Sequence, residues 1–213
     1  MKRARERILG GRRAALSALV LAAASCLSKP ALAPQSFSID PPAFHPAAAA
    51  PEARVLSLSR VEVAPPYGGK SFVYRIGEHG IERDPYASFA VTPGWMLTSA
   101  IRGYLRNADF VKDVVAPGEG TRAAAAVEAY ASELCGDLSN PAEPSAVLTL
   151  QLRVLVPAAG TAPASEILLK TYTERVPWPQ RTASAAADAW NRALAEIMTE
   201  FLGDLKRVLM SLP

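Results

Sequence analysis

Histidine and cysteine are scarce in this chain of 213 residues, which contains two of each. A zinc site or a Ser-His-Asp triad needs at least one well-anchored imidazole or a group of thiolates. His45 lies in a segment rich in proline and alanine, and His79 lies in a Gly-Glu-His-Gly turn, so neither is well anchored. We therefore expect no enzyme, no cofactor and no bound metal.

An excess of basic residues is also missing once the N-terminus is set aside. Residues 1–25 carry six of the 23 basic side chains and one of the 20 acidic ones, which leaves 17 basic against 19 acidic residues. A nucleic-acid-binding domain needs a basic surface that neutralises phosphates. The sequence therefore predicts no nucleic-acid partner.

The N-terminus has the pattern of an export signal. Six basic residues precede an uncharged stretch at residues 14–24, which is too short to span a bilayer. Residues 23–26, Ala-Ala-Ser-Cys, resemble a bacterial lipobox, although Ala23 stands where leucine is usual. In a lipobox the cysteine is acylated and becomes the new N-terminus, so we expect Cys26 to carry the lipid, with palmitate among its chains. The alternative is ordinary leader cleavage after Ala24, with Cys26 incidental.

Lipidation at Cys26 decides where the protein is held. Several acyl chains on one cysteine give durable attachment, whereas a single chain binds a membrane only marginally. In similar lipoproteins an aspartate after the cysteine accompanies retention in the inner membrane, and this chain has Leu27 there. We therefore expect the periplasmic face of the outer membrane. Cys135 would then be the only free thiol, so no disulfide can form within the chain, and we expect it to be buried.

About 185 residues remain after processing, enough for one domain with a real core. Residues 26–53 are rich in proline and alanine and predict a lipidated tether and connector, with a short strand at residues 37–40. Residues 54–213 then form a single domain.

Within that domain the periodicity of apolar residues predicts both strands and helices. Thr92 followed by Pro93 predicts a capped helix that runs to about Asn107. A long C-terminal helix begins near Thr182 or Ser184. Alternating or β-branched segments predict strands at residues 55–63, 72–76, 110–115, 147–156 and 167–176. The apolar stripe of the C-terminal helix comprises Ala187, Trp190, Leu194, Ile197, Phe201, Leu205 and Leu209.

Residues 123–138 are ambiguous on their own. Alanine and glutamate favour a helix by propensity. A strand would instead place Val127, Ala129 and Ala131 on one face.

Several short motifs, taken in order, resemble the auxiliary lipoprotein family of ABC-type transport systems, which includes the PqiC and YmbA lipoproteins. They comprise the strand that ends in Pro41-Pro42, the Pro65-Pro66-Tyr67 corner, the strand at residues 72–75, and residues 86–97, which are similar to the family's Tyr-x-x-Trp-x-x-x-Pro-x-x-Met-Leu passage. Phe89 stands where that passage has tryptophan. The resemblance covers nearly all of the mature chain.

The resemblance implies an α+β fold, an antiparallel sheet with two helices packed on one face, and it favours a strand at residues 123–134. It further implies a non-catalytic lipoprotein that works with an MCE-domain periplasmic protein and an ABC permease and ATPase. Such systems move lipids or other hydrophobic molecules between membranes. Whether the domain itself binds lipid or forms a homo-oligomer is left open. The alternative is an envelope structural or assembly lipoprotein that binds another envelope protein and has no transporter partner.

Other patterns point to ordinary structural roles. The sequence Gly68-Gly69-Lys70-Ser71 resembles the end of a phosphate-binding loop, but a strand-forming segment follows it, so we predict a turn. Glu196 and Glu200 are four residues apart and predict a solvated helix face. The corners at Tyr67 and Trp178, each next to prolines, are candidate exposed anchors for a partner protein.

Overall fold

The computed structural model describes residues 33–40, 43, 53–119, 122–158 and 163–212. The strands of these residues, in chain order, are β1 (Gln35–Phe37), β2 (Arg54–Leu58), β3 (Glu62–Val63), β4 (Ser71–Ile76), β5 (Gly80–Phe89), β6 (Val111–Val115), β7 (Ala125–Asp137), β8 (Ser145–Val156) and β9 (Ser165–Pro177). A short 3-10 helix, η1 (Pro65–Tyr67), and the helices α2 (Pro93–Arg106) and α3 (Ala183–Met210) complete the set.

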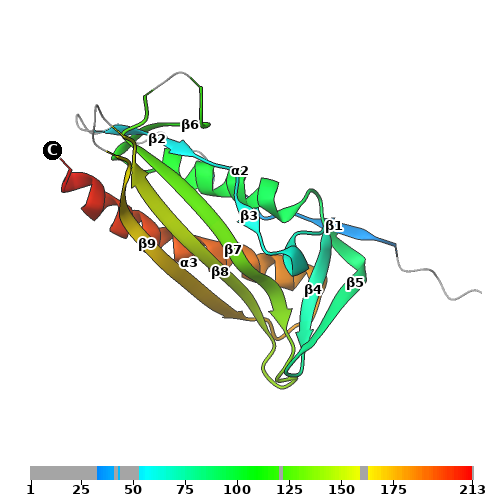
Figure 1. Ribbon diagram of the computed structural model, residues 1–213. Coiled ribbons are helices and arrows are strands. Elements are labelled where there is room, and N and C mark those ends of the chain that lie inside the picture. Colours follow the sequence, from blue (N-terminus) through cyan, green and yellow to red (C-terminus); the bar gives the residue numbers. More distant parts are fainter. Residues whose placement is uncertain (1–32, 41–42, 44–52, 120–121, 159–162, 213) are drawn as a thin grey trace, which may run out of the picture. The chain divides into compact units, whose positions relative to one another are not determined.

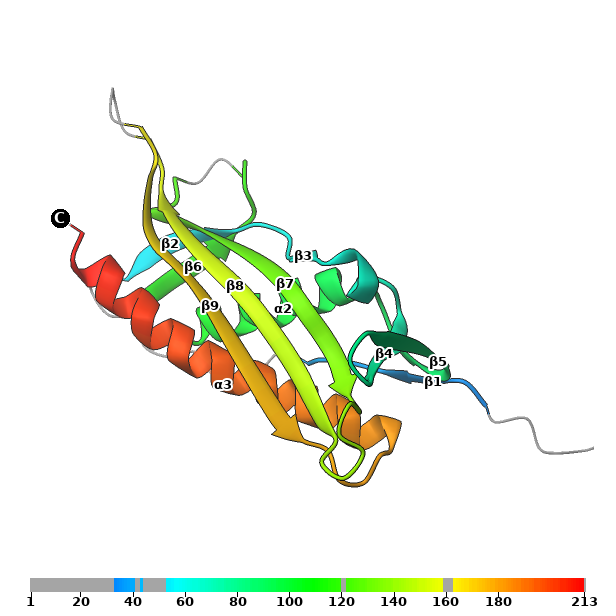
Figure 2. The same cartoon turned by 60° about the horizontal axis from the view of Figure 1, so that its bottom comes forward.

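All of these strands join one sheet, and both helices contribute to one hydrophobic core beneath it. In Figure 1, β7, β8 and β9 cross in front of α3, and α2 lies behind β2 and β3. Figure 2 shows α3 running beside the full length of β9. The α+β class and the two helices predicted from the sequence are confirmed.

The sheet is mixed, which corrects the prediction of an antiparallel sheet. Neighbours β7 and β8, β8 and β9, and β4 and β5 are antiparallel. The strands β2, β3 and β4 instead run parallel to β7, one after another along the same edge. The strand β6 also pairs parallel to β2. Parallel strands need a crossover connection between them, and the chain passes through α2 before it enters β6.

The segment at residues 123–138 is a strand, as the resemblance implied, because tertiary pairing overrides its helical propensity. The strand β7 pairs with β8 along nearly its whole length. Ala125, Val127, Ala129 and Ala131 point into the core, and Glu128 and Tyr130 alternate with them on the outer face.

Apolar side chains of the two helices fill the concave face of the sheet. All seven residues of the predicted C-terminal stripe are buried. The Trp190 ring packs edge-on against Phe72, with ring centroids 4.8 Å apart, and Phe72 lies 4.6 Å from Phe89. Phe89 therefore fills a core position.

The strand β5 was not predicted, and β1 covers residues 35–37, whereas a strand at residues 37–40 was expected. Pro85 lies within β5, and prolines are depleted in paired strands. The Asp84 carboxylate accepts hydrogen bonds from the amides of Tyr86 and Ala87, each at 2.8 Å, where the register between β4 and β5 shifts. The side chain thus satisfies amides at the irregularity.

Helix α3 holds the chain just after β1. The Asn191 amide accepts a hydrogen bond from the Asp40 amide at 2.9 Å and donates to the Ser38 carbonyl at 3.2 Å. These two bonds, called the Asn191 bridge below, fix the N-terminal strand to the C-terminal helix.

Candidate functional site

The site begins with an interruption in the strand path along β7. The strand β2 pairs with β7 as far as Val127, and β3 resumes pairing at Tyr130. The Ser59 amide still donates to the Val127 carbonyl at 3.1 Å, and residues 60–61 then leave this ladder. Their departure opens a pocket on each side of the β2–β3 segment.

Helix α2 draws the interrupted segment away from β7. The Val61 amide donates to Thr98 Oγ1 at 2.9 Å, and that hydroxyl donates to the Gly94 carbonyl at 2.6 Å. A Cβ on Gly94 would lie 2.8 Å from the Val61 carbonyl oxygen, so only glycine lets the strand approach the first turn of the helix this closely. The hydroxyl and the glycine together set the shape of the opening.

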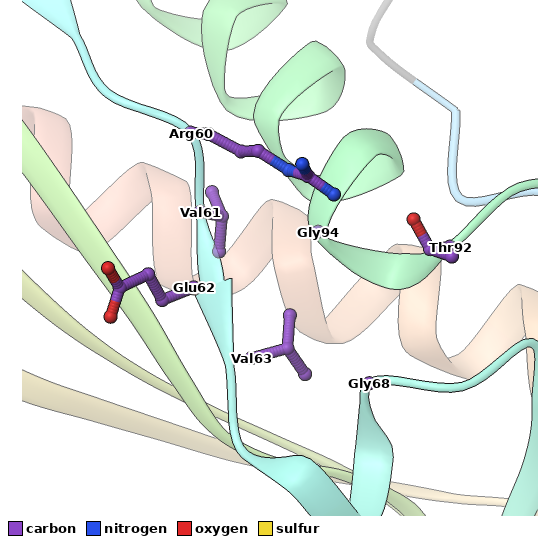
Figure 3. Close-up of a pocket in the computed structure, with 7 residues that line it drawn as sticks. All are labelled: Arg60, Val61, Glu62, Val63, Gly68, Thr92 and Gly94. Carbon is purple, nitrogen blue, oxygen red and sulfur yellow. The ribbon is translucent and has the colours of Figure 1, made fainter.

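The first pocket lies between β3 and the start of α2 (Figure 3) and has a volume of about 500 Å³. The Arg60 side chain reaches over the first helical turn, and Glu62 points away from it toward β7. The residues that line it are Arg60, Val61, Glu62, Val63, Gly68, Thr92 and Gly94.

Thr92 does not cap α2 with its side chain, contrary to the prediction. The amides of Trp95 and Met96 bond to the Thr92 backbone carbonyl instead, at 3.0 and 3.3 Å. Among the described residues, Thr92 Oγ1 is a buried oxygen for which no hydrogen-bond partner is present. The first helical turn also has no acidic residue.

Trp95 is an exposed aromatic residue in the first turn of α2, next in the chain to Gly94 of the pocket lining. Its side chain is 58% exposed, and the Arg60 guanidinium lies 4.4 Å from the ring centroid. Such a stack holds a cation and a large apolar surface in one fixed arrangement. The sequence gives no signal for the stacking of Trp95 on Arg60, because the two residues are far apart in the chain and meet only in the fold.

The second pocket lies on the outer face of the sheet, has a volume of about 310 Å³ and shares Arg60 and Glu62 with the first. Tyr130 in this pocket is 39% exposed. Arg153 binds Glu166 at 2.7 Å and lies 3.5 Å from Glu128, which fixes its guanidinium beside the tyrosine. We call the residues Glu128, Tyr130, Gln151 and Arg153 the outer-face groove.

The two predicted partner anchors lie elsewhere. Trp178 is only 3% exposed, so it does not form the exposed corner that we expected. Its ring stacks on Tyr74, and its Nε1 donates to the Thr182 carbonyl at 2.9 Å. Tyr67 is partly buried and packs against Cys135 and its neighbours on the outer face.

A network of charged and polar side chains crosses the outer face near Tyr67. Burial would raise the pKa of Asp137, but hydrogen bonds from Arg175 and Ser139 and the charge of Arg75 outweigh it and lower the pKa to about 2. Arg75 also binds Glu133, which accepts a hydrogen bond from Thr149. Each member has a partner, so the network joins β4, β7, β8 and β9 and offers no unpaired group for chemistry.

The remaining sequence candidates do not assemble into a reactive centre. The His79 side chain is 88% exposed at the tip of the β4–β5 hairpin. Cys26 and His45 lie outside the described residues. The Gly68–Gly69 segment leads into the strand β4, which confirms a turn in place of a phosphate-binding loop. Within the part of the chain that the structure describes, no group of three or more His, Cys, Asp or Glu residues is placed to hold a metal ion.

Comparison with known proteins identifies relatives by fold and not by sequence. No family model and no curated protein matches the chain. Protein XCC0632 from Xanthomonas campestris, described as DUF330, has a similar structure with a TM-score of 0.65 and 16% sequence identity. The similarity covers 84% of this chain and 95% of that one. An uncharacterised protein is similar with a TM-score of 0.56 and 9% identity over 80% of this chain and 99% of its own. The chain therefore shares the DUF330 fold.

None of the helices in the described ranges is both long enough and apolar enough to cross a membrane.

Proposed function

We propose that this protein is a non-catalytic lipoprotein, attached through Cys26 to the periplasmic face of the outer membrane. It would serve as the auxiliary component of an MCE/ABC-type system that moves lipids or other hydrophobic molecules between membranes. The observation that carries the proposal is the ordered set of motifs that resemble this family. The Tyr86 to Leu97 passage contributes Thr92 and Gly94 to the lining of the first pocket. The absence of a catalytic constellation in the sequence supports a docking role.

The outer-face groove is the surface that we assign to the protein partner. Tyr130 presents an exposed ring, and Arg153 is held beside it by two carboxylates, so little side-chain entropy is lost when a partner covers them. Tyrosine and arginine are also the residues that dominate binding energy at many interfaces. An MCE-domain protein would contact this groove.

The attachment is tested with Cys26→Ala, expressed with its own export signal. We expect the variant to leave the membrane fraction and lose function, and N-terminal mass spectrometry of the wild type to find acylated Cys26. Cys135→Ala is the matched control, because Cys135 is buried in the folded domain and should leave attachment unchanged. A Cys26→Ala protein that stays membrane-bound and fully functional would contradict the proposal.

The partner is tested by crosslinking the intact lipoprotein in cells and identifying what co-purifies. We expect an MCE-domain protein, and Tyr130→Ala should weaken its capture by about tenfold or more, as for a central interface residue. Met210→Ala removes a side chain that is 68% exposed at the far end of α3 and should change nothing. Capture of another envelope protein, with no transporter genes adjacent, would favour the structural or assembly role instead.

A further inference from the structure

One end of the domain combines exposed aromatic and basic side chains where the chain enters the sheet. Both Figure 1 and Figure 2 place β1, β4, β5 and η1 at this end and the C-terminus at the other. The strand β1 pairs with β5 so that Gln35 lies opposite Ala87, next to Tyr86, whose side chain is exposed. The chain before Gln35 therefore reaches the fold beside Tyr86.

Hydrogen bonds join the neighbouring residues to β1. The Phe37 carbonyl accepts the amide of Ala90, and the Ala90 carbonyl accepts the Lys70 ammonium at 3.0 Å. A Cβ on Gly69, the residue before Lys70, would lie 3.8 Å from the Arg83 guanidinium, so two basic groups flank the end of β1. Val91, which follows Ala90 in the chain, has an exposed side chain.

Gly68, near Lys70 in the chain, lines the first pocket together with Thr92 and Gly94 at the start of α2, and Trp95 follows Gly94 and stacks on Arg60. We call this set the tether-end surface; it comprises Arg60, Lys70, Arg83, Tyr86, Val91 and Trp95. The tether-end surface thus holds two aromatic rings, an exposed valine and three basic groups. Two exposed carboxylates accompany them: Glu62, which lines the first pocket with Arg60, and Glu82, which precedes Arg83 in β5.

The length of the tether limits how far this surface can lie from the anchor. Nine residues lead from Cys26 to Gln35, and a fully extended chain of that length spans about 30 Å at most. If Cys26 is acylated, as the proposed function requires, the membrane surface is within that distance of β1. Tryptophan and tyrosine favour the headgroup region, and arginine and lysine bind lipid phosphates there.

We propose that the tether-end surface rests on the lipid headgroups of the membrane that holds Cys26, with Trp95 inserted at the interface. The inference rests on the proposed lipid attachment and adds an orientation to it. The first pocket then opens toward the membrane, and the opposite end of α3 points away.

Tryptophan fluorescence of the full-length lipidated protein tests this contact. Trp178 and Trp190 are buried, so Trp95 is the exposed tryptophan of the described residues. In vesicles of phosphatidylethanolamine and phosphatidylglycerol with brominated acyl chains, we expect lower emission than in the same vesicles without bromine. The Trp95→Phe variant should lose this difference. Its position is well exposed, so the fold should tolerate the change.

A matched control moves the reporter to the other end of the molecule. Met210→Trp in the Trp95→Phe background should show equal emission with and without bromine, because residue 210 ends α3 far from β1. Removing the charges with Lys70→Ala and Arg83→Ala together should reduce the quenching of Trp95.

Flotation of each sample separates the two hypotheses. A protein that floats with the vesicles but shows no bromine quenching of Trp95 overturns the membrane contact and leaves the attachment intact. Equal quenching of the residue 210 reporter overturns the stated orientation. A protein that does not float contradicts the attachment itself, and the inference fails with it.

Discussion

Gly136 permits the closest packing between the sheet and the corner that leads into α3. Its position in β7 lies opposite Tyr74 of β4, and the Tyr74 and Trp178 rings stack over it with centroids 5.6 Å apart. A Cβ at this position would lie 2.8 Å from both Trp178 Cζ3 and Tyr74 Cδ1. Real Cβ atoms essentially never come so close to a ring carbon, so Gly136→Ala must move both rings or shift the backbone of β7.

Neither ring can move without losing a hydrogen bond. Trp178 Nε1 donates to the Thr182 carbonyl at 2.9 Å, and the Tyr74 hydroxyl donates to Asp84 at 2.8 Å. Overpacking costs about 1–3 kcal/mol, whereas replacing a strand glycine with alanine returns about 0.5–1 kcal/mol of backbone entropy. We expect Gly136→Ala to lower the free energy of unfolding by about 1–2 kcal/mol, the net of these effects.

Urea unfolding followed by circular dichroism measures the change, with Gly203→Ala as the control. Gly203 lies in α3 on the exposed side, and no atom lies within 4 Å of its hypothetical Cβ. Alanine there should raise the free energy of unfolding by about 0.5–1 kcal/mol. A Gly136→Ala protein as stable as the wild type, beside a stabilised Gly203→Ala, would refute the packing argument.

Three further predictions concern buried polar groups. Asp204→Asn should lower the free energy of unfolding by about 2 kcal/mol in the same urea assay, because Asp204 is 7% exposed and binds the Lys170 ammonium and the buried Tyr172 hydroxyl, each at 2.8 Å. The lowered pKa of Asp137 should stabilise the fold by about 2 kcal/mol above pH 4, and this contribution should disappear as the pH falls toward 2. Urea unfolding of the wild type and of Asp137→Asn at pH 6 and pH 2 measures the contribution. A difference in stability between the two proteins that is the same at both pH values would contradict it. Burial raises the pKa of the Cys135 thiol to about 11, so a thiol reagent at pH 8 should label it only after denaturation.

Periodicity was enough to predict the helices and the β8–β9 hairpin. The seven-residue stripe of α3 and the alternation of β8 each follow one face, and that face is buried. Residues 123–138 needed the family resemblance, because alanine-rich strands have no local signal that outweighs helix propensity. The parallel pairings could not be predicted, since the run of β2, β3 and β4 along β7 depends on contacts distant in sequence.

The candidate site was less accessible to sequence reasoning than the fold. The interruption at residues 60–61 depends on Thr98 and Gly94, which approach this segment only after α2 packs. Proline beside an aromatic residue suggested exposure at Trp178, but its stacking on Tyr74 buries it. In the fold, the Arg60 side chain lies over one face of the Trp95 ring, and the rest of the ring is exposed.

The Asn191 bridge gives the domain a mechanical property. A pull along the chain before Gln35 acts parallel to β1, so the hydrogen bonds between β1 and β5 are loaded together in shear. Any load that passes β1 meets the two Asn191 bonds, which transmit it to the 28-residue helix α3 and hence to the core. Force applied at the N-terminus is thus distributed over the whole domain, and the strand nearest the tether is not peeled away alone.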